Sequence, residues 1–296
     1  MDEITDYLRS FSVSLRAANK APRTVETYSL AVERFALFLA DQGMPTRLAD
    51  IERRHIQEHL AWLTEHRAAA TAAQRYGSLR RFFGWAHEEG EIDANPMDGL
   101  KRPKVTEKPV PVVSDDDIRK LLDACNGPSF EDRRDTAIIR LFLDTGARLS
   151  EITQLTTEAV DLDRQQILTT VKGGRVRAMP FGNRCAQALD RYERARRRHR
   201  YASVPWLWLG PKGRLGPSGI YQMMRRRAKQ AGIGHLHPHQ LRHTFAHNWL
   251  SSGGSEGDLV RLLGWSDRQM LDRYGSSAAE GRATDAFRRS PLTDRL

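Results

Sequence analysis

The segment "ANPMDGLKRPKVTEKPVPVV", residues 94–113, divides the sequence into two parts of different character. It holds four prolines and four basic residues, and its apolar residues follow no helical period. Proline has no amide hydrogen to donate, so this composition predicts an extended linker rather than a helix or an internal strand. We therefore predict two domains, residues 1–100 and residues 114–296, joined by a linker over residues 101–113.

The part before the linker is patterned as helices. Apolar residues recur every three or four positions in residues 22–43, 51–66 and 71–90. That spacing places them along one face of a helix, where they form a core when the helices pack together. The sequence thus predicts an all-helical first domain.

The part after the linker changes period at "QQILTTVKGGRVRAMPFG", residues 165–182. Apolar residues alternate on both sides of Gly173-Gly174, which is typical of a β-hairpin. Helices are predicted around this hairpin, over residues 115–125, 134–146, 147–155, 186–200, 217–231, 238–250, 258–264 and 267–275. We expect a mainly α-helical fold with a small antiparallel β-sheet, in which the second domain is mixed α/β.

Positive charge is concentrated in one stretch of the chain. The formal net charge is +10, yet residues 1–104 carry 15 basic and 15 acidic residues, whereas residues 172–242 carry 17 basic and two acidic ones. Such a block is typical of a surface that binds nucleic acid, although an arginine-rich solvated face would have the same composition. The candidate DNA-binding residues are Lys101, Arg102, Lys104, Arg175, Arg177, Arg225, Arg226 and Arg227.

Several classes of protein are disfavoured by composition. The two cysteines, Cys125 and Cys185, are too few for a disulfide framework or a cysteine-rich zinc site, which favours a reducing compartment. No apolar run approaches the ~20 residues of a membrane span, and the acidic N-terminus is unlike a signal peptide. We expect a cytoplasmic protein.

The stretch "HPHQLRHTFAHNWL", residues 237–250, allows three interpretations. His239 and His243 stand four apart, as zinc ligands do on a helix, but glutamine follows the first histidine where a zinc protease has glutamate. The histidines could instead be structural or capping residues. His239 and Arg242 stand three apart and share a helix face, which suits a phosphate group.

Five motifs together resemble the tyrosine recombinase (phage integrase) family in order and in spacing. They are "DTGARLSE", "TTVKGGRVRAMP", "HQLRHTFA", "LLGWSD" and "MLDRYG", at residues 144–151, 169–180, 239–246, 262–267 and 270–275. The first hundred residues also resemble the family's core-binding (SAM-like) domain. The similarity is greatest to short Xer-type members, which lack an arm-binding domain.

The resemblance implies a site-specific DNA recombinase and assigns its main catalytic groups. Tyr274 is the nucleophile that forms a 3′-phosphotyrosyl intermediate, and Lys172 is the general acid for the 5′-oxygen. Arg148 and Arg242 bind the non-bridging phosphate oxygens, for which the planar guanidinium is well suited. Neither a metal ion nor ATP is implied.

The remaining positions of the motifs have auxiliary roles by the same resemblance. His239 and Trp265 add hydrogen bonds to the phosphate, while Glu151 and His243 support the other side chains. Two positions depart from the Xer pattern: Trp265 replaces the commoner histidine, and "GSS" follows Tyr274. An indole N–H donates a hydrogen bond but transfers no proton, so acid–base chemistry at Trp265 is not expected.

The resemblance also implies partners. One partner is double-stranded DNA with an inverted-repeat core site. The other is the chain itself, since four copies are expected to assemble on two duplexes. The protein is expected to associate with the nucleoid when it is bound to DNA. The C-terminal residues 278–296 are expected to dock on a neighbouring copy. A catalytically inactive, sequence-specific DNA-binding protein is the alternative of another class, and a zinc hydrolase is a second. The sequence identifies neither the target site nor accessory proteins, and integration, excision, dimer resolution and inversion all stay open, as does a phage or mobile-element origin.

Overall fold

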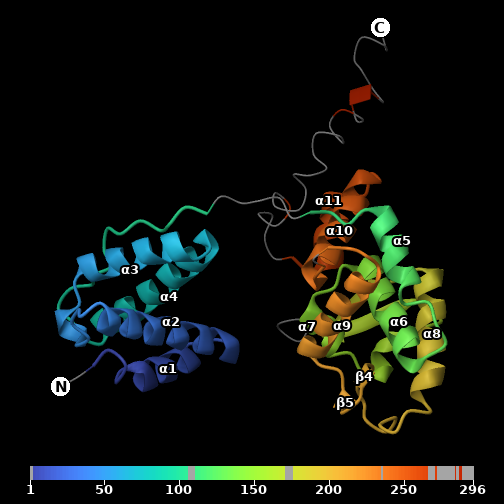
Figure 1. Cartoon of the computed structure of the whole chain (residues 1–296), viewed down its shortest axis with the longest axis horizontal. Coiled ribbons are helices and arrows are strands. Elements are labelled where there is room, and N and C mark those ends of the chain that lie inside the picture. Colours follow the sequence, from blue (N-terminus) through green and yellow to red (C-terminus); the bar gives the residue numbers. More distant parts are fainter. Residues whose placement is uncertain are drawn as a thin grey trace. The chain divides into compact units, whose positions relative to one another are not determined.

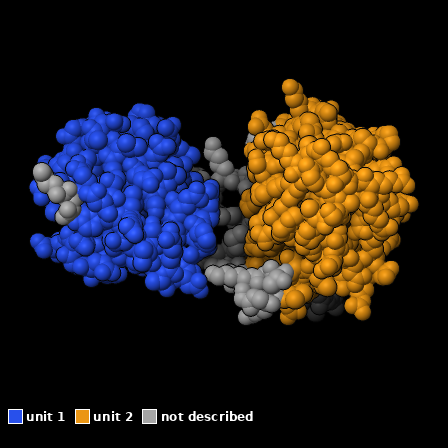
Figure 2. Space-filling view, turned by 90° about the horizontal axis from the view of Figure 1, so that it is seen from below, with its two compact units in different colours: residues 1–108 blue, residues 109–296 orange. Residues whose placement is uncertain are grey.

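The protein is described here from a computed structural model, which divides into two compact units, Met1–Lys108 and Pro109–Leu296 (Figure 1, Figure 2). The division falls within the segment that we predicted as the linker. No helix within the described residues is both long and apolar enough to cross a membrane. The structure describes residues 3–105, 111–170, 176–234 and 236–265, together with residues 271, 284, 287 and 288.

Unit 1 is all-helical, as predicted. Its elements are α1 (Leu8–Ala17), α2 (Pro22–Asp41), the 3-10 turn η1 (Leu48–Asp50), α3 (Arg53–His66) and α4 (Ala69–Glu88). Helix α2 begins at Pro22, whose missing amide hydrogen is not needed in the first turn. The phenylalanines Phe11, Phe35, Phe82 and Phe83 are fully buried where α1, α2 and α4 meet.

Unit 2 contains the remaining elements of the described chain. Its helices are α5 (Asp115–Asp123), α6 (Phe130–Thr145), α7 (Leu149–Thr153), η2 (Thr157–Ala159), α8 (Asn183–Arg196), α9 (Pro217–Gln230), α10 (Pro238–Ser251) and α11 (Glu256–Leu263). Its strands are β1 (Val160–Asp161), β2 (Gln166–Thr170), β3 (Val176–Pro180), β4 (Leu209–Gly210) and β5 (Gly213–Arg214). The fold is thus mainly helical with small antiparallel sheets, as predicted.

The predicted hairpin is present as β2 and β3, with Ile167 paired to Met179. Both side chains are buried against the helices, and β1 extends the sheet antiparallel to β2. The tip of the hairpin lies outside the described residues. A second two-stranded sheet, β4 with β5, was not predicted, because strands of two residues leave no alternation to detect.

Helix α6 is the centre of unit 2 and packs against α8 and α10. It begins four residues before the predicted start, because Ser129 caps it by accepting the amide hydrogen of Asp132 at 3.0 Å. It ends at Gly146, whose φ of 57° is the left-handed conformation that glycine adopts readily. Arg148, a candidate active-site residue, follows two positions after this turn.

Candidate active site

Arg242 is held inside unit 2 by main-chain oxygens. It lies in α10 and is only 2% exposed. Its Nη1 donates to the carbonyl oxygen of Gly146 at 2.7 Å, and its Nη2 donates to that of Leu263 at 2.9 Å. Two bonds from separate segments fix the plane of the guanidinium.

Arg148 lies at the N-terminus of α7, two residues after Gly146. Its main-chain nitrogen donates to Oε2 of Glu151 at 2.7 Å, and its Nη1 donates to Oε1 of the same carboxylate at 3.0 Å. Its Nη2 reaches the carbonyl oxygen of Gly264 at 3.4 Å. Arg148 and Arg242 therefore contact neighbouring carbonyl groups, those of residues 264 and 263, and the fold brings the two guanidinium groups together.

Glu151 links this pair to the sheet. Its carboxylate also accepts a hydrogen bond from Nη2 of Arg177 at 3.0 Å. Burial alone would raise the pKa of Glu151, but the main-chain amide of Arg148 and the two arginine charges outweigh it and lower the pKa. Glu151 thus favours its ionised form and contacts Arg148 through both carboxylate oxygens.

Arg177 differs from its predicted role as an exposed DNA-binding side chain. It is 10% exposed and lies against Glu151 and the Met179 sulfur. It occupies this position because β3 alternates, so that residues 177 and 179 face the same side. Gly264, with a φ of 59°, admits it: a β-carbon there would collide with Nη1 of Arg177. No pattern in the sequence indicates this contact directly.

The histidines of α10 occupy different environments. His239 is exposed, whereas His243 is 4% exposed, and their rings meet edge to face with centroids 4.9 Å apart. Within the described residues, no group of three or more histidine, cysteine or acidic side chains could hold a metal ion. Trp265 is 7% exposed, with its ring centroid 5.6 Å from Cζ of Arg242. Trp265 therefore packs beside the arginine pair.

Three predicted site residues, Lys172, Arg175 and Tyr274, lie outside the described residues. Their positions relative to Arg148 and Arg242 therefore stay predictions. Lys101, Arg102 and Lys104 are exposed after α4, as a surface that contacts DNA requires.

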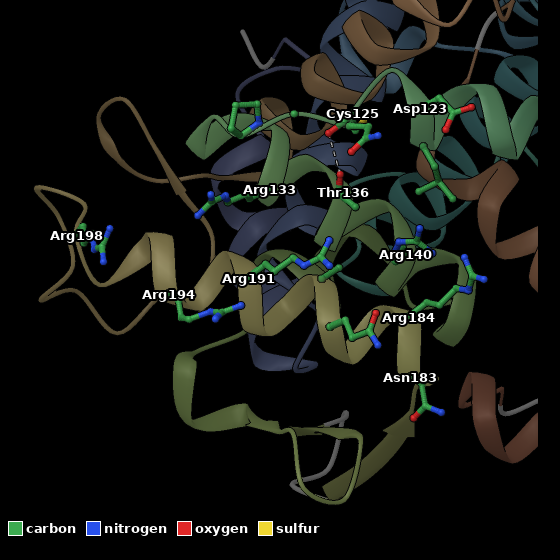
Figure 3. A pocket seen from close by; sticks show the side chains of 16 residues that line it. Asp123, Cys125, Arg133, Thr136, Arg140, Asn183, Arg184, Arg191, Arg194 and Arg198 are labelled. Atoms are coloured by element: carbon green, nitrogen blue, oxygen red, sulfur yellow. Dashed lines mark hydrogen bonds between the residues drawn. The ribbon is translucent and has the colours of Figure 1, made fainter.

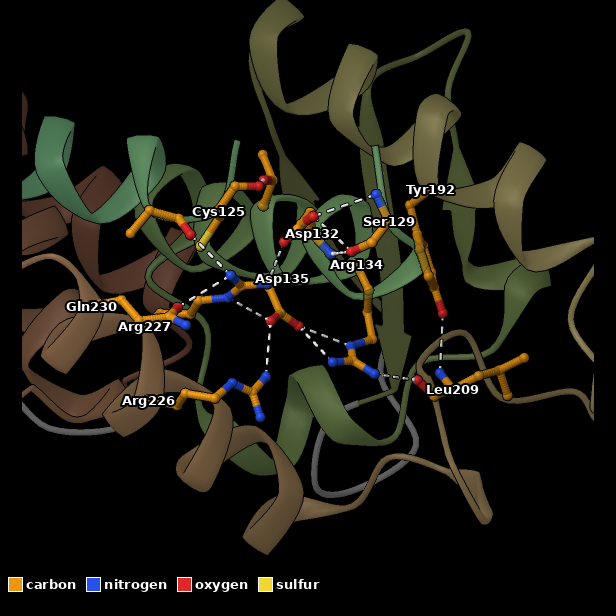
Figure 4. Close-up of polar contacts among 12 residues, drawn as sticks. Cys125, Ser129, Asp132, Arg134, Asp135, Tyr192, Leu209, Arg226, Arg227 and Gln230 are labelled. Atoms are coloured by element: carbon orange, nitrogen blue, oxygen red, sulfur yellow. Dashed lines mark hydrogen bonds and ion pairs between the residues drawn. The ribbon is translucent and has the colours of Figure 1, made fainter. Parts of the chain in front are cut away.

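The three consecutive arginines of α9 have different surroundings, because successive side chains of a helix point about 100° apart. Arg225 is exposed, and Arg226 is half exposed with Nη2 3.2 Å from Asp135. Arg227 differs from the DNA-binding expectation: it is buried, 2.7 Å from Asp132 and 2.8 Å from Asp135 (Figure 4). The two aspartates were not singled out in the sequence, although they stand three apart on one face of a helix.

The chain is similar to known proteins over both of its units. The sequence matches the phage integrase family over residues 111–280 and the N-terminal SAM-like domain of phage integrases over residues 7–90. The tyrosine recombinase XerC of Chromobacterium violaceum is 35% identical over 283 residues, which cover 93% of this chain and 90% of that protein.

Solved structures show the same fold. The XerH site-specific recombinase bound to palindromic difH substrate, in a post-cleavage complex, matches with a TM-score of 0.75 and 18% identity over 96% of this chain and 84% of that one. A lambda integrase dimer bound to a COC′ core site matches with a TM-score of 0.71 and 18% identity over 90% of this chain and 75% of that one. The chain therefore belongs to the phage integrase family, the tyrosine recombinases.

Proposed function

We propose that this chain recombines DNA at a specific site, and that Arg148 and Arg242 bind the phosphate that Tyr274 attacks. The observation that carries the proposal is the contact of both guanidinium groups with the adjacent carbonyls of Leu263 and Gly264. Residues almost one hundred positions apart thereby form one cationic pair. Two charged forks at one place suit a single anion with several oxygens, which a phosphodiester provides.

The proposed reaction exchanges one phosphodiester bond for another. The Tyr274 oxygen attacks the phosphorus, the bond to the 5′-oxygen breaks, and a 3′-phosphotyrosyl bond forms. The tyrosine gives up its proton to solvent with assistance from His239, and Lys172 donates a proton to the departing 5′-oxygen. A free tyrosine has a pKa near 10, so the cationic pair also assists by stabilising negative charge on the phosphate as the attack proceeds. The reverse attack by a 5′-hydroxyl of another strand completes the exchange.

The proposed partner is double-stranded DNA. The relatives described above were solved with a difH substrate and with a COC′ core site, and the predicted DNA-binding residues Lys101, Arg102, Lys104 and Arg225 are exposed in this chain. We further propose an inverted-repeat core site, assembly of four copies on two duplexes, and residence in the cytoplasm at the nucleoid. His239 and Trp265 add donors beside the arginine pair, and buried His243 supports His239 through ring contact.

The decisive experiment traps the covalent intermediate. Duplexes are first selected by binding from a random inverted-repeat pool, then nicked near the centre so that cleavage releases a short fragment and cannot be reversed. With EDTA present, we expect a protein–DNA adduct that survives SDS and is absent in Tyr274→Phe. Tyr201→Phe, which removes a hydroxyl from a partly exposed tyrosine elsewhere in unit 2, should retain the adduct.

The other outcomes separate the alternatives. Tight binding to the selected duplexes without any adduct would indicate the inactive DNA-binding protein. An adduct that forms only without EDTA would indicate metal-dependent chemistry. An adduct retained by Tyr274→Phe would exclude this tyrosine as the nucleophile.

A further inference from the structure

A second basic surface lies between α6 and α8. A groove of about 1110 Å³ is formed there by α6, α8, the end of α5 and the loop between α5 and α6 (Figure 3). Six arginines line it, and Asp123 is the one carboxylate among the lining residues. The arginines are Arg133, Arg140, Arg184, Arg191, Arg194 and Arg198.

The arginines of α8 form a row. Residues 184, 187, 191 and 194 are spaced by three or four positions, so they lie on one face of the helix. Arg184 and Arg194 are separated by about 15 Å along the axis, since a helix rises 1.5 Å per residue. Across the groove, Arg133 and Arg140 on α6 face the same space (Figure 3). The groove therefore carries charge along its length rather than at one point.

These charges are poorly compensated by the protein itself. Within the described residues, only Arg194 among the six forms an ion pair, with Asp190 at 2.8 Å, and both partners are half exposed or more. Exposed ion pairs of this kind contribute little to the stability of the protein. Like charges that face one another across a groove repel, so an anion that enters between them is attracted strongly.

The groove is separate from the candidate active site. None of its lining residues belongs to the cluster of Arg148, Glu151, Arg177, Arg242 and Trp265. Helix α8 lies at one edge of unit 2 and α7, which begins just after Arg148, lies toward the other (Figure 1). A phosphate held by Arg148 and Arg242 is therefore not the group that the α6–α8 groove binds.

We propose that the α6–α8 groove binds the sugar–phosphate backbone of a second segment of double-stranded DNA. One strand presents a phosphate every 3.4 Å along the helix axis, so the row from Arg184 to Arg194 spans about four base pairs. A small anion would occupy only one or two of the six arginines, whereas a phosphate chain engages the whole row. Four of the six arginines belong to the basic block of residues 172–242. Part of this block therefore lies in the groove, away from Arg148 and Arg242. The proposal rests on the proposed function in one respect: a first duplex is bound at Arg148 and Arg242.

The test counts duplexes bound to the full-length protein. A fluorescent 20-base-pair duplex of random sequence is titrated, and bound duplexes per protomer are measured by analytical ultracentrifugation. We expect two binding events for the wild type and one for the triple variant Arg184→Gln, Arg191→Gln and Arg194→Gln. In the triple variant, the remaining event should keep the Kd of the first wild-type event within about twofold. In the wild type, the affinity of the second event should fall as the salt concentration rises, with a log–log slope of about 3 in magnitude, since each phosphate contact contributes about 0.9.

A matched variant controls for the loss of three charges. Arg119, Lys120 and Arg261 each form an ion pair with an aspartate three residues earlier and lie outside the groove. Their replacement by glutamine should leave both events intact. All six substituted side chains are exposed, so thermal unfolding should be unchanged in both variants.

Three outcomes would overturn the proposal: a single event in the wild type, a second event retained by the groove variant, or loss of the first event in that variant. Binding of poly-glutamate in the groove, with no second duplex, would assign it to an acidic protein instead. The Tyr274 adduct is measured separately, so failure of the proposed cleavage and failure of this second site give different results. The groove variant should form the adduct at the wild-type rate.

Discussion

Arg227 and Arg242 are both buried in unit 2, with 6% and 2% exposure, yet they are bound in different ways. Arg227 donates to the carboxylates of Asp132 and Asp135. Arg242 donates to the main-chain oxygens of Gly146 and Leu263. A carboxylate cancels the charge of an arginine, whereas a carbonyl orients the group and leaves its charge.

The contrast separates an arginine paired with carboxylates from the one that we propose binds phosphate. The ion pairs of Arg227 join α9 to α6, and the two carboxylates neutralise its charge. The contacts of Arg242 join the turn after α6 to the end of α11 and hold its guanidinium beside Arg148. Buried arginine is therefore not one class of residue, and the identity of the acceptor distinguishes the two.

The largest effect on stability is expected at Asp135, which is fully buried. Its Oδ1 accepts two hydrogen bonds from Arg134, and its Oδ2 accepts one from Arg227. Asp135→Asn leaves the buried guanidinium groups of Arg134 and Arg227 without this negative charge. The free energy of unfolding should fall by about 3–5 kcal/mol. Urea denaturation followed by circular dichroism measures the loss.

An exposed carboxylate provides the control. Asp190 lies in the middle of α8, half exposed and paired with Arg194. Asp190→Asn should change the free energy of unfolding by less than about 1 kcal/mol. A similar loss in both variants would mean that burial does not distinguish these ion pairs.

The largest effect on activity is expected at Arg242. Arg242→Ala should reduce the rate of adduct formation by about 10² to 10³, as removal of one donor to a developing anion does. DNA binding should persist, because the basic surface is otherwise intact. Gel shift and adduct formation on the same selected duplexes measure the two properties. A variant that cleaves at the wild-type rate would remove Arg242 from the reaction.

The fold class could be predicted because each helix buries an apolar stripe that repeats along the chain. Helices α2, α3 and α4 follow the predicted segments closely, and the hairpin follows its alternation. The sheet of β4 and β5 could not be predicted, because two residues per strand are fixed by tertiary contacts rather than by pattern. The start of α6 was misplaced because Glu131, Asp132 and Arg133 in its first turn are charged and the start is determined by the Ser129 cap.

The candidate site was predicted from motif resemblance, but its internal contacts were not. Spacing shows that His239 and Arg242 share a helix face, yet it does not show that main-chain oxygens of distant residues hold Arg242. Arg177 and Arg227 were expected on the DNA surface because charge alone does not reveal burial. Only the fold shows that Glu151 and Asp135 lie against them.

The carbonyl that holds Arg242 provides a test of intermediate size. Gly146 has a φ of 57°, and a β-carbon there would lie 2.6 Å from Cδ1 of Phe245 and 2.7 Å from Cδ2 of Leu263. Gly146→Ala therefore strains the backbone and displaces both neighbours, and with them the acceptors of Arg242. Adduct formation should slow by about 10- to 100-fold, since a small misplacement of a catalytic group has that effect.

Gly253 is the matched control for this variant. It also has a positive φ, of 83°, but no atom lies within 4 Å of an added β-carbon. Gly253→Ala should cost only the backbone strain of about 1–2 kcal/mol and leave the cleavage rate unchanged. Equal losses of activity in the two variants would mean that backbone strain, not the position of the Gly146 carbonyl, explains the effect.

The smallest effect concerns acid pH and Asp132, one of the carboxylates that bind Arg227. The hydroxyl of Ser129 and then Arg227 lower the pKa of Asp132 below its usual value of 3.8. A carboxylate with a lowered pKa in the folded state stabilises the protein above the unfolded pKa, and this contribution is lost as pH falls through the folded pKa. Unfolding measured from pH 6 to pH 2 should therefore show a weaker acid dependence below about pH 4 in Asp132→Asn than in the wild type. Arg242→Ala leaves Asp132 and its contacts with Ser129 and Arg227 in place, so it should keep the contribution of Asp132 to the acid dependence. An equal change in both variants would mean that Asp132 is not the source of the difference.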